Sequence, residues 1–249
     1  MKEQIYTIPV NEAFDEDCEC PLCFLAKRLE KEGVDYELGA AMMEPDHREE
    51  SDKVGFCNRH LDMMFKKQNR LSLALVLDTH LNKIRQELEK NKDEIYAAEG
   101  TKKSLFKKSG SAQVAAENLS QTLDKVESGC MVCKKIDYTM NRYIDVMLYL
   151  WEREEEFREK FQNSKGFCIP HMNDIAKAVP KYLSAAKRGE FLKVLYDKQE
   201  KELKRVQEDI HKFTLKFDYR NKDMEWGTAQ DAPIRTIEKI ISYVPDEEQ

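Results

Sequence analysis

Cysteine residues recur in this chain at a spacing that suits metal binding. Cys20 and Cys23 form one Cys-x-x-Cys pair, and Cys130 and Cys133 form another. A turn of this length aims two thiolates at one point, and two further ligands would complete a tetrahedral zinc site. We therefore interpret each pair as half of a metal site.

The hexapeptide Gly-Phe-Cys-x-x-His also occurs twice and supplies the other halves. It contains Cys57 with His60 in the first copy and Cys168 with His171 in the second. A cysteine and a histidine three residues apart in the first turn of a helix project from one face. The glycine can take the left-handed backbone that ends a preceding helix. We interpret the hexapeptide as a device of the fold that presents two ligands, rather than as an active motif.

The spacing of the half-sites predicts which of them combine. The gap between Cys23 and Cys57 holds 33 residues, and the gap between Cys133 and Cys168 holds 34. A helical hairpin across each gap would bring neighbouring half-sites together. We therefore predict two Cys3His sites, and their ligand sets are Cys20, Cys23, Cys57 and His60 for the first, and Cys130, Cys133, Cys168 and His171 for the second.

Zinc is the metal that these ligand sets favour. Cys3His is a usual structural zinc set, and a filled tetrahedron leaves no open position for water. Cys18 makes the first group of thiols denser than zinc requires, which keeps an iron–sulfur cluster open as an alternative. Ser128 stands at the equivalent position in the second half, so we interpret Cys18 as a spare thiol. Thiol redox chemistry and exchangeable metal handling are further alternatives.

Catalysis has no positive support in the sequence. It contains no Ser/His/Asp set, no phosphate-binding glycine loop and no His-Glu-x-x-His motif. Glu44 and Asp46 could orient His60 from outside the ligand shell, although Asp46 suits a helix cap better. The other histidines have no partner at ligand spacing: His47, His80 and His211. We predict a non-enzymatic protein that serves as an interaction or adaptor module.

Helices are the elements that must position these ligands. Strand-like alternation is nearly absent, and only nine glycines and seven prolines interrupt the 249 residues, so we predict an all-α helical bundle. Apolar residues at helical spacing predict long helices from Leu73 to Leu88, from Ile136 to Phe161 and from Leu192 to Phe217. Around Ile8 we predict extended backbone, because Pro9 disfavours a helical conformation there.

The order of motifs and helices predicts an internal repeat. Equivalent cysteines such as Cys20 and Cys130 lie 110 residues apart, which suits two copies of one unit. The predicted organisation is repeat 1 with the first site at residues 1–98, a linker loop at 99–112, repeat 2 with the second site at 113–220, and a C-terminal extension with a short helix at 221–249.

Composition limits the partners and the compartment. The net charge of −6 argues against a nucleic-acid-binding face. No apolar run approaches the roughly 20 residues of a membrane span, and the first residues lack the apolar core of a signal peptide. Clustered thiols in a reducing cytosol are metal ligands or redox groups more often than disulfides. We expect a cytoplasmic protein that does not associate with membranes and whose partner is another protein.

Several motifs together resemble an uncharacterised bacterial family, a domain of unknown function found mainly in clostridia-like Firmicutes. The resemblance covers nearly the whole chain. It implies a cytosolic bacterial protein with paired Cys-x-x-Cys and Gly-Phe-Cys-x-x-His motifs and no assigned activity. The segments that carry it are residues 8–14 (IPVNEAF), 19–23 (ECPLC), 42–46 (MMEPD), the two hexapeptides and 217–220 (FDYR).

Overall fold

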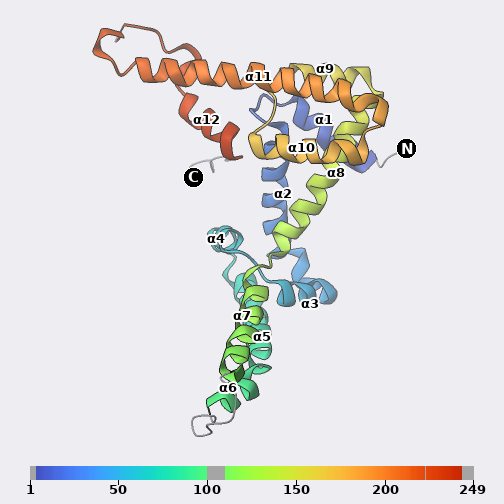
Figure 1. The fold of residues 1–249 in the computed structure, drawn as a ribbon, viewed down its shortest axis with the longest axis vertical. Helices are drawn as coiled ribbons and strands as arrows, with labels where there is room; N and C mark the ends of the chain where they lie inside the picture. Colours follow the sequence, from blue (N-terminus) through green and yellow to red (C-terminus); the bar gives the residue numbers. More distant parts are fainter. Residues whose placement is uncertain (1–3, 100–109, 222, 243–249) are drawn as a thin grey trace. The chain divides into compact units, whose positions relative to one another are not determined.

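The computed structural model describes residues 4–99, 110–221 and 223–242, and its regular elements are helices (Figure 1). In these ranges the chain forms twelve α-helices, three short 3-10 turns and no strand. This confirms the predicted all-α class. None of the described helices combines the length and the apolar composition that a membrane crossing requires.

The helices belong to two compact units. Unit 1 comprises residues 1–29 and 137–249, and unit 2 comprises residues 30–136. Unit 2 is therefore an insertion within unit 1 along the chain. Its two boundaries fall inside helices, namely α2 (Pro21–Glu37) and α8 (Met131–Arg153).

These units do not coincide with the two halves at residues 1–98 and 113–220. The internal repeat stays a prediction from the spacing of the motifs. Most of the proposed linker, residues 100–109, lies outside the described residues, and the ends of the linker are helical, since α6 ends at Glu99 and α7 begins at Gly110. The short helix expected in the C-terminal extension is present as α12 (Ala232–Ile241).

Unit 1 is built around an aromatic core. Phe14 lies 4.9 Å from Phe157 between ring centroids, and Phe161 lies 5.6 Å from Phe167. Aromatic side chains bury 150–250 Å² each and dominate the stability of such cores. Phe167 belongs to the second hexapeptide, so the core anchors that motif. The helices of this unit, besides parts of α2 and α8, are α1 (Gln4–Asp15), α9 (Glu155–Asn163), α10 (Ile169–Tyr182), α11 (Ala185–Leu215) and α12.

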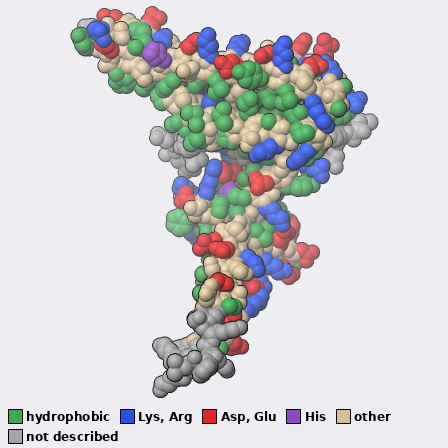
Figure 2. All heavy atoms as spheres, in the orientation of Figure 1, with side chains coloured by type: hydrophobic (Ala, Val, Ile, Leu, Met, Phe, Trp, Pro, Cys, Tyr) green, Lys and Arg blue, Asp and Glu red, His purple; other side chains and the backbone are tan. Residues whose placement is uncertain are grey.

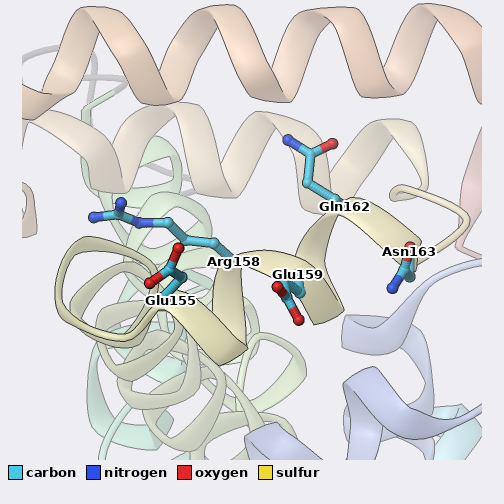
Figure 3. Close-up of a pocket in the computed structure, with 5 residues that line it drawn as sticks. All are labelled: Glu155, Arg158, Glu159, Gln162 and Asn163. Atoms are coloured by element: carbon cyan, nitrogen blue, oxygen red, sulfur yellow. The ribbon is translucent and has the colours of Figure 1, made fainter.

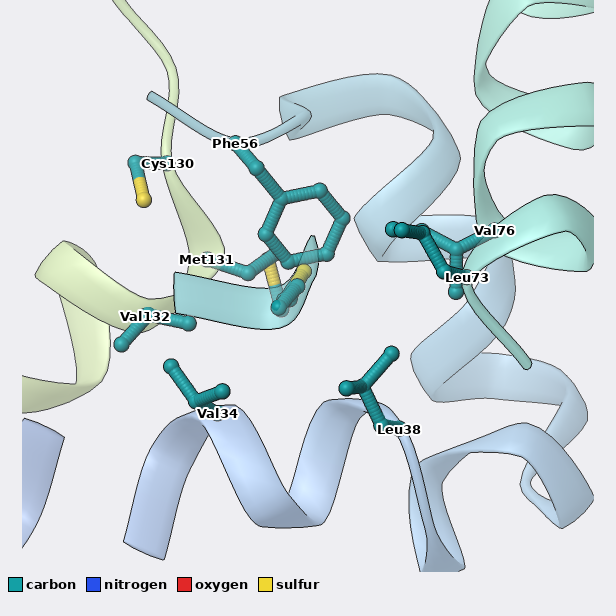
Figure 4. Packing of buried hydrophobic residues seen from close by; sticks show 9 residues of the cluster. Val34, Leu38, Phe56, Leu73, Val76, Cys130, Met131 and Val132 are labelled. Carbon is teal, nitrogen blue, oxygen red and sulfur yellow. The ribbon is translucent and has the colours of Figure 1, made fainter. Parts of the chain in front are cut away.

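Unit 2 has a separate apolar core around Phe56, the phenylalanine of the first hexapeptide (Figure 4). Leu73 and Val76 lie on one side of Phe56, while Met131 and Val132 come from the start of α8. Both hexapeptides are thus held by a buried phenylalanine. The remaining elements of this unit are the 3-10 turn η1 (Ala40–Met43), α3 (Pro45–Val54), α4 (Asn58–Lys66), α5 (Arg70–Glu89), α6 (Lys92–Glu99) and α7 (Gly110–Glu127).

The N-terminal segment is helical, not extended as predicted. Helix α1 contains Pro9 in its interior, where the missing N–H removes one backbone hydrogen bond. Val10 and Ala13 on the same helix are fully buried, and Phe14 joins the aromatic core. Burial of this apolar face offsets the lost hydrogen bond, because a fully buried large side chain contributes about 1.5–3 kcal/mol.

The predicted helix from Ile136 to Phe161 is broken at Glu154. This residue is extended, with φ −119° and ψ 119°, and α9 starts directly after it. Arg158 donates hydrogen bonds to the carbonyl oxygens of Trp151 and Glu152, at 2.6 and 2.8 Å. The side chain thereby satisfies acceptors at the end of α8. Phe157 and Phe161 both remain buried after the break. The apolar pattern in the sequence therefore continues through Glu154 and does not reveal the end of α8.

Candidate metal centres

The eight predicted ligands converge in two groups. In each group, the ligand atoms all lie within 4.8 Å of one another. We name these groups cluster A and cluster B. Each cluster lies wholly within one unit, cluster A in unit 1 and cluster B in unit 2. Cluster A contains Cys20, Cys23, Cys168 and His171, and cluster B contains Cys57, His60, Cys130 and Cys133.

The structure combines the half-sites differently from the predicted pairing. Each Cys-x-x-Cys pair meets the hexapeptide from the other half of the chain. Cys23 lies next to Cys168, 145 residues away, instead of next to Cys57. Closing this longer loop costs only about 1 kcal/mol more, since closure entropy rises by about 0.6 kcal/mol per doubling of loop length. A few long-range contacts therefore outweigh the advantage of the nearer partner.

In cluster A, the histidine ring lies at the centre of the contacts. His171 Nδ1 is 3.5 Å from Cys20 Sγ, 3.3 Å from Cys23 Sγ and 3.1 Å from Cys168 Sγ. Cys23 Sγ and Cys168 Sγ are 3.5 Å apart. All three cysteines are buried.

Cluster B repeats this arrangement. His60 Nδ1 is 3.1 Å from Cys57 Sγ, 3.2 Å from Cys130 Sγ and 3.4 Å from Cys133 Sγ. The sulfur atoms of Cys57 and Cys133 are 3.9 Å apart. Cys57 and Cys133 are half-buried, so this cluster is more accessible than cluster A.

These distances fit a single tetrahedral ion. Zinc–sulfur bonds of about 2.3 Å and zinc–nitrogen bonds of about 2.0–2.1 Å place the corners of a tetrahedron about 3.8 Å apart for two sulfurs, and about 3.5 Å apart for sulfur and nitrogen. The separations given above run from 3.1 to 3.9 Å, and all ligand atoms of a cluster lie within 4.8 Å of one another. Each cluster can therefore hold one metal ion with four protein ligands.

All four half-sites lie at the amino-terminal ends of helices. Cys57 and Cys168 are the N-caps of α4 and α10, while Cys20 and Cys130 directly precede α2 and α8. The positive end of a helix dipole favours the thiolate over the thiol. The helix starts thus aim the ligands and favour the charge state that metal binding needs.

Both hexapeptide glycines adopt positive φ, as their sequence predicted. The φ angle is 76° at Gly55 and 78° at Gly166, a region that other residues enter with strain. Gly55 is the C-cap of α3, and its N–H donates to the carbonyl oxygen of Ser51. The glycine ends one element so that the next can start at the cysteine.

Gly129 lets the second Cys-x-x-Cys pair approach the first hexapeptide. The N–H of Met131 donates to the carbonyl oxygen of Gly55 at 3.0 Å, and a Cβ atom on Gly129 would lie only 1.9 Å from the carbonyl oxygen of Val54. Because backbone would have to move, we expect Gly129→Ala to separate the half-sites of cluster B. The purified variant should hold one metal ion per chain in place of two and should melt at a lower temperature.

The matched control for this substitution is Gly189→Ala in α11. A Cβ atom there meets nothing within 4 Å, and alanine favours a helix over glycine by roughly 1 kcal/mol. This variant should keep both ions and melt at the same or a higher temperature. A Gly129→Ala protein that also keeps both ions would contradict the role of the close approach.

Glu30 orients His60 from outside the ligand shell. Its Oε1 atom lies 3.1 Å from His60 Nε2, and its Oε2 atom accepts a hydrogen bond from Arg59 at 2.7 Å. Burial opposes ionisation of Glu30, but the hydrogen bond to His60 and the charge of Arg59 lower the pKa of this carboxyl. A carboxylate on the outer nitrogen fixes the ring so that Nδ1 faces the sulfurs.

Glu44 and Asp46, which the sequence offered as possible partners of His60, lie elsewhere. Glu44 accepts a hydrogen bond from the Tyr36 hydroxyl at 2.8 Å. The N-cap of α3 is Glu44 and not, as the sequence suggested, Asp46, because the helix already begins at Pro45 and Asp46 lies in its first turn. Glu30 carries no local signal, because it stands 30 residues before its histidine in the sequence. Gln199 was missed for the same reason. Its side chain accepts from the N–H of Phe167 at 3.0 Å and donates to the carbonyl oxygen of Phe167 at 2.8 Å.

We expect Glu30→Gln to weaken metal binding at cluster B by 10- to 100-fold, which is typical for loss of an outer-shell partner. The affinity of cluster A should not change. Competition with a chromophoric chelator measures both affinities. Glu37→Gln is the control, because Glu37 is another buried carboxylate of α2 that pairs with His47 at 2.9 Å and belongs to neither cluster. Equal effects of the two substitutions would contradict the assignment.

One family model matches the chain over residues 1–247, and its description is a family of unknown function, DUF6062. The chain belongs to this family. The match confirms the resemblance to an uncharacterised family that the motifs indicated. No curated protein matches the chain, and no solved structure matches it. The function of this DUF6062 protein must therefore be inferred from its own residues.

In both clusters, hydrogen bonds between the histidine and the thiols shift the pKa values of these groups. Burial opposes protonation of His60, but hydrogen bonds to Cys130 and Glu30 raise its pKa to about 10. Burial alone would raise the pKa of the Cys130 thiol, but the hydrogen bond to His60 has the opposite effect, and the pKa is lowered to about 6. The pKa of His171 is also raised to about 10, against the effect of burial, by Cys168 and Cys23. A divalent ion would replace the proton at Nδ1, so metal binding releases protons.

The remaining candidates from the sequence lie outside both clusters. Cys18 belongs to neither, and burial raises the pKa of its thiol to about 11, which suits a spare, protonated thiol. His80 hydrogen-bonds the carbonyl oxygen of Asp52 at 2.8 Å. His47 pairs with Glu37, and His211 is exposed.

A pocket of about 470 Å³ lies along α9 in this DUF6062 chain (Figure 3). Its lining residues all come from α9, and none belongs to either cluster. Arg158, the cation among them, is engaged with carbonyl oxygens of α8. The pocket therefore shares no residue with the two clusters. Its lining residues are Glu155, Arg158, Glu159, Gln162 and Asn163.

Proposed function

We propose that the protein binds two zinc ions, one in each cluster, and that these ions have a structural role. The observation that carries this proposal is the placement of three sulfurs around one histidine nitrogen in both clusters, at 3.1–3.5 Å. Four protein ligands fill a zinc tetrahedron and leave no position for water or substrate. The ions would join segments that are far apart in the sequence.

The spacing of the ligands argues against an iron–sulfur cluster. Ligands of such a cluster bind different iron atoms and must spread around a core of several atoms. In both clusters the four ligand atoms lie within 4.8 Å of one another, and Cys18 is not among them. A single ion suits this compact arrangement better.

Metal exchange is the second candidate function, and cluster B favours it. Its Cys57 and Cys133 are half-buried, whereas the three cysteines of cluster A are buried. Partly accessible thiolates allow a client or a chelator to displace a ligand. Under this alternative, cluster B would pass its ion to another protein while cluster A keeps a structural ion.

Anaerobic purification followed by metal analysis and an absorption spectrum tests the proposal. We expect two zinc ions per chain and no absorption above about 320 nm, because zinc has a filled d shell. Iron with acid-labile sulfide would contradict the structural-zinc proposal. Release of one ion within minutes to a mild chelator would support exchange at cluster B.

We further propose that the scaffold acts as a non-enzymatic module for a protein partner. Large apolar side chains such as Leu71, Phe217 and Tyr219 are 73–84% exposed, and exposed apolar groups can contribute to a protein interface. Acidic and basic side chains are intermingled over the face in Figure 2, and the net charge is −6. A nucleic-acid partner would favour a basic face, so a shift of labelled duplex DNA at physiological salt would contradict this proposal.

A further inference from the structure

Helix α12 places a buried ammonium group beside cluster A. Lys239 on this helix is only 1% exposed. Its Nζ atom donates hydrogen bonds to the carbonyl oxygens of Glu19 and Lys165, both at 2.5 Å. It also lies 3.1 Å from Oε2 of Glu19. A buried lysine is rare unless its charge is paired and its donors are satisfied, and here three acceptors surround it.

The two carbonyl groups belong to the two halves of cluster A. Glu19 directly precedes Cys20 of the Cys-x-x-Cys pair, and Lys165 directly precedes Gly166 of the second hexapeptide. One ammonium group therefore joins the backbone segments that carry the four ligands.

Cluster B makes the equivalent connection with its own backbone. There the N–H of Met131 donates to the carbonyl oxygen of Gly55. The residue at the equivalent position of cluster A is Pro21, which follows Cys20 as Met131 follows Cys130. Proline has no N–H, so cluster A cannot form this bond. Lys239 supplies the missing donor from a third segment.

The end of the same helix reaches a ligand. Ser242 is the C-cap of α12, with φ 61°, and its Oγ atom lies 3.1 Å from Cys23 Sγ. Three thiolates and one Zn²⁺ carry a net charge of −1. A buried cation and a hydroxyl donor next to this group stabilise the negative charge, as outer-shell groups do at other metal sites.

We propose that Lys239 and Ser242 are positioning residues of cluster A, and that α12 acts as a clamp that holds a metal ion there. This inference rests on the proposed function, because it concerns how long cluster A keeps its metal ion. It also distinguishes the two clusters. The half-sites of cluster B are joined by a backbone hydrogen bond between them, whereas those of cluster A depend on a C-terminal helix.

The test compares Lys239→Met with Lys198→Met in the full chain. Lys198 is a matched control, since it is also buried, bonds the carbonyl oxygen of Gln162 and pairs with Glu202, and neither of these partners belongs to cluster A. Both substitutions are made in the native chain and in a Cys57→Ala chain, where cluster A is the remaining complete cluster. Zinc retention is measured as the rate of transfer to a chromophoric chelator.

We expect Lys239→Met to speed zinc loss from cluster A by at least about 10-fold, in the range of other outer-shell substitutions, and to leave cluster B unchanged. Lys198→Met should leave both rates unchanged. Unchanged circular dichroism at 222 nm shows that each variant keeps its helices, including those of unit 1. Equal acceleration by the two substitutions, or none by Lys239→Met, would overturn the inference.

Ser242→Ala provides a second variant with a spectroscopic readout. In the Cys57→Ala chain loaded with Co²⁺, loss of the hydroxyl donor should shift the thiolate-to-cobalt charge-transfer band, which a purely structural role of Ser242 would not do. An unshifted band would overturn its assignment. A native chain that binds no metal overturns the proposed function together with this inference, whereas two retained ions unaffected by Lys239→Met overturn this inference alone.

Discussion

Replacing Cys20 and Cys168 together by alanine should remove one metal ion per chain, whereas replacing Cys20 and Cys57 together should remove two. The first pair of cysteines belongs to cluster A, and the second pair divides between clusters A and B. Had the half-sites combined with their nearest neighbours along the chain, the two results would be exchanged. Metal analysis of the purified variants distinguishes the two outcomes.

Thermal stability should follow the same pattern. Once Cys20 is replaced, replacing Cys168 as well should lower the thermal stability little further, because the effects of two residues that bind the same ion are not additive. The Cys20→Ala and Cys57→Ala effects should add, since they act on separate ions. Cys18→Ala serves as the control and should keep both ions. Loss of an ion from this control would contradict the exclusion of Cys18 from cluster A.

Removal of both ions should unfold most of the helical structure. A structural zinc site contributes roughly 10–16 kcal/mol of apparent free energy in small zinc-binding peptides, whereas a whole domain has a net stability of about 5–15 kcal/mol. Loss of one such contribution is therefore comparable with the whole net stability of a typical domain. We expect a large loss of circular dichroism at 222 nm when a strong chelator is added.

The signal should return when zinc is supplied in excess over the chelator. A sample that receives chelator already saturated with zinc is the control for direct effects of the reagent. Full helicity with no metal bound would show that the apolar cores alone hold the fold. The clusters would then have to be interpreted as exchange sites.

The eight candidate ligand residues and the helical class could be predicted from the sequence because both depend on local patterns. A Cys-x-x-Cys turn and a Cys-x-x-His helix start each need only a few residues, and apolar periodicity reveals a helix without knowledge of its neighbours. Even the positive φ of Gly55 and Gly166 follows from the motif in which they occur.

The pairing of half-sites could not be predicted in the same way. The two Cys-x-x-Cys pairs are chemically alike, and so are the two hexapeptides, so the ligands themselves do not distinguish the combinations. The choice depends on contacts between distant segments, such as Met131 with Gly55 in unit 2 and Lys239 with Glu19 and Lys165 in unit 1. The helix through Pro9 was missed for a related reason, since its stability comes from packing and not from its own sequence.

The insertion of unit 2 within unit 1 has a consequence for the order of synthesis. Cys57 and His60 emerge from the ribosome soon after Cys20 and Cys23, when the correct partners Cys168 and His171 have not yet been made. A nascent chain that meets zinc at this stage can close the local, non-native combination. Domains form from the amino terminus as they are synthesised, but cluster A has all four of its residues only when His171 has emerged. Late metallation thus favours the native chain, and early metallation favours a kinetic trap.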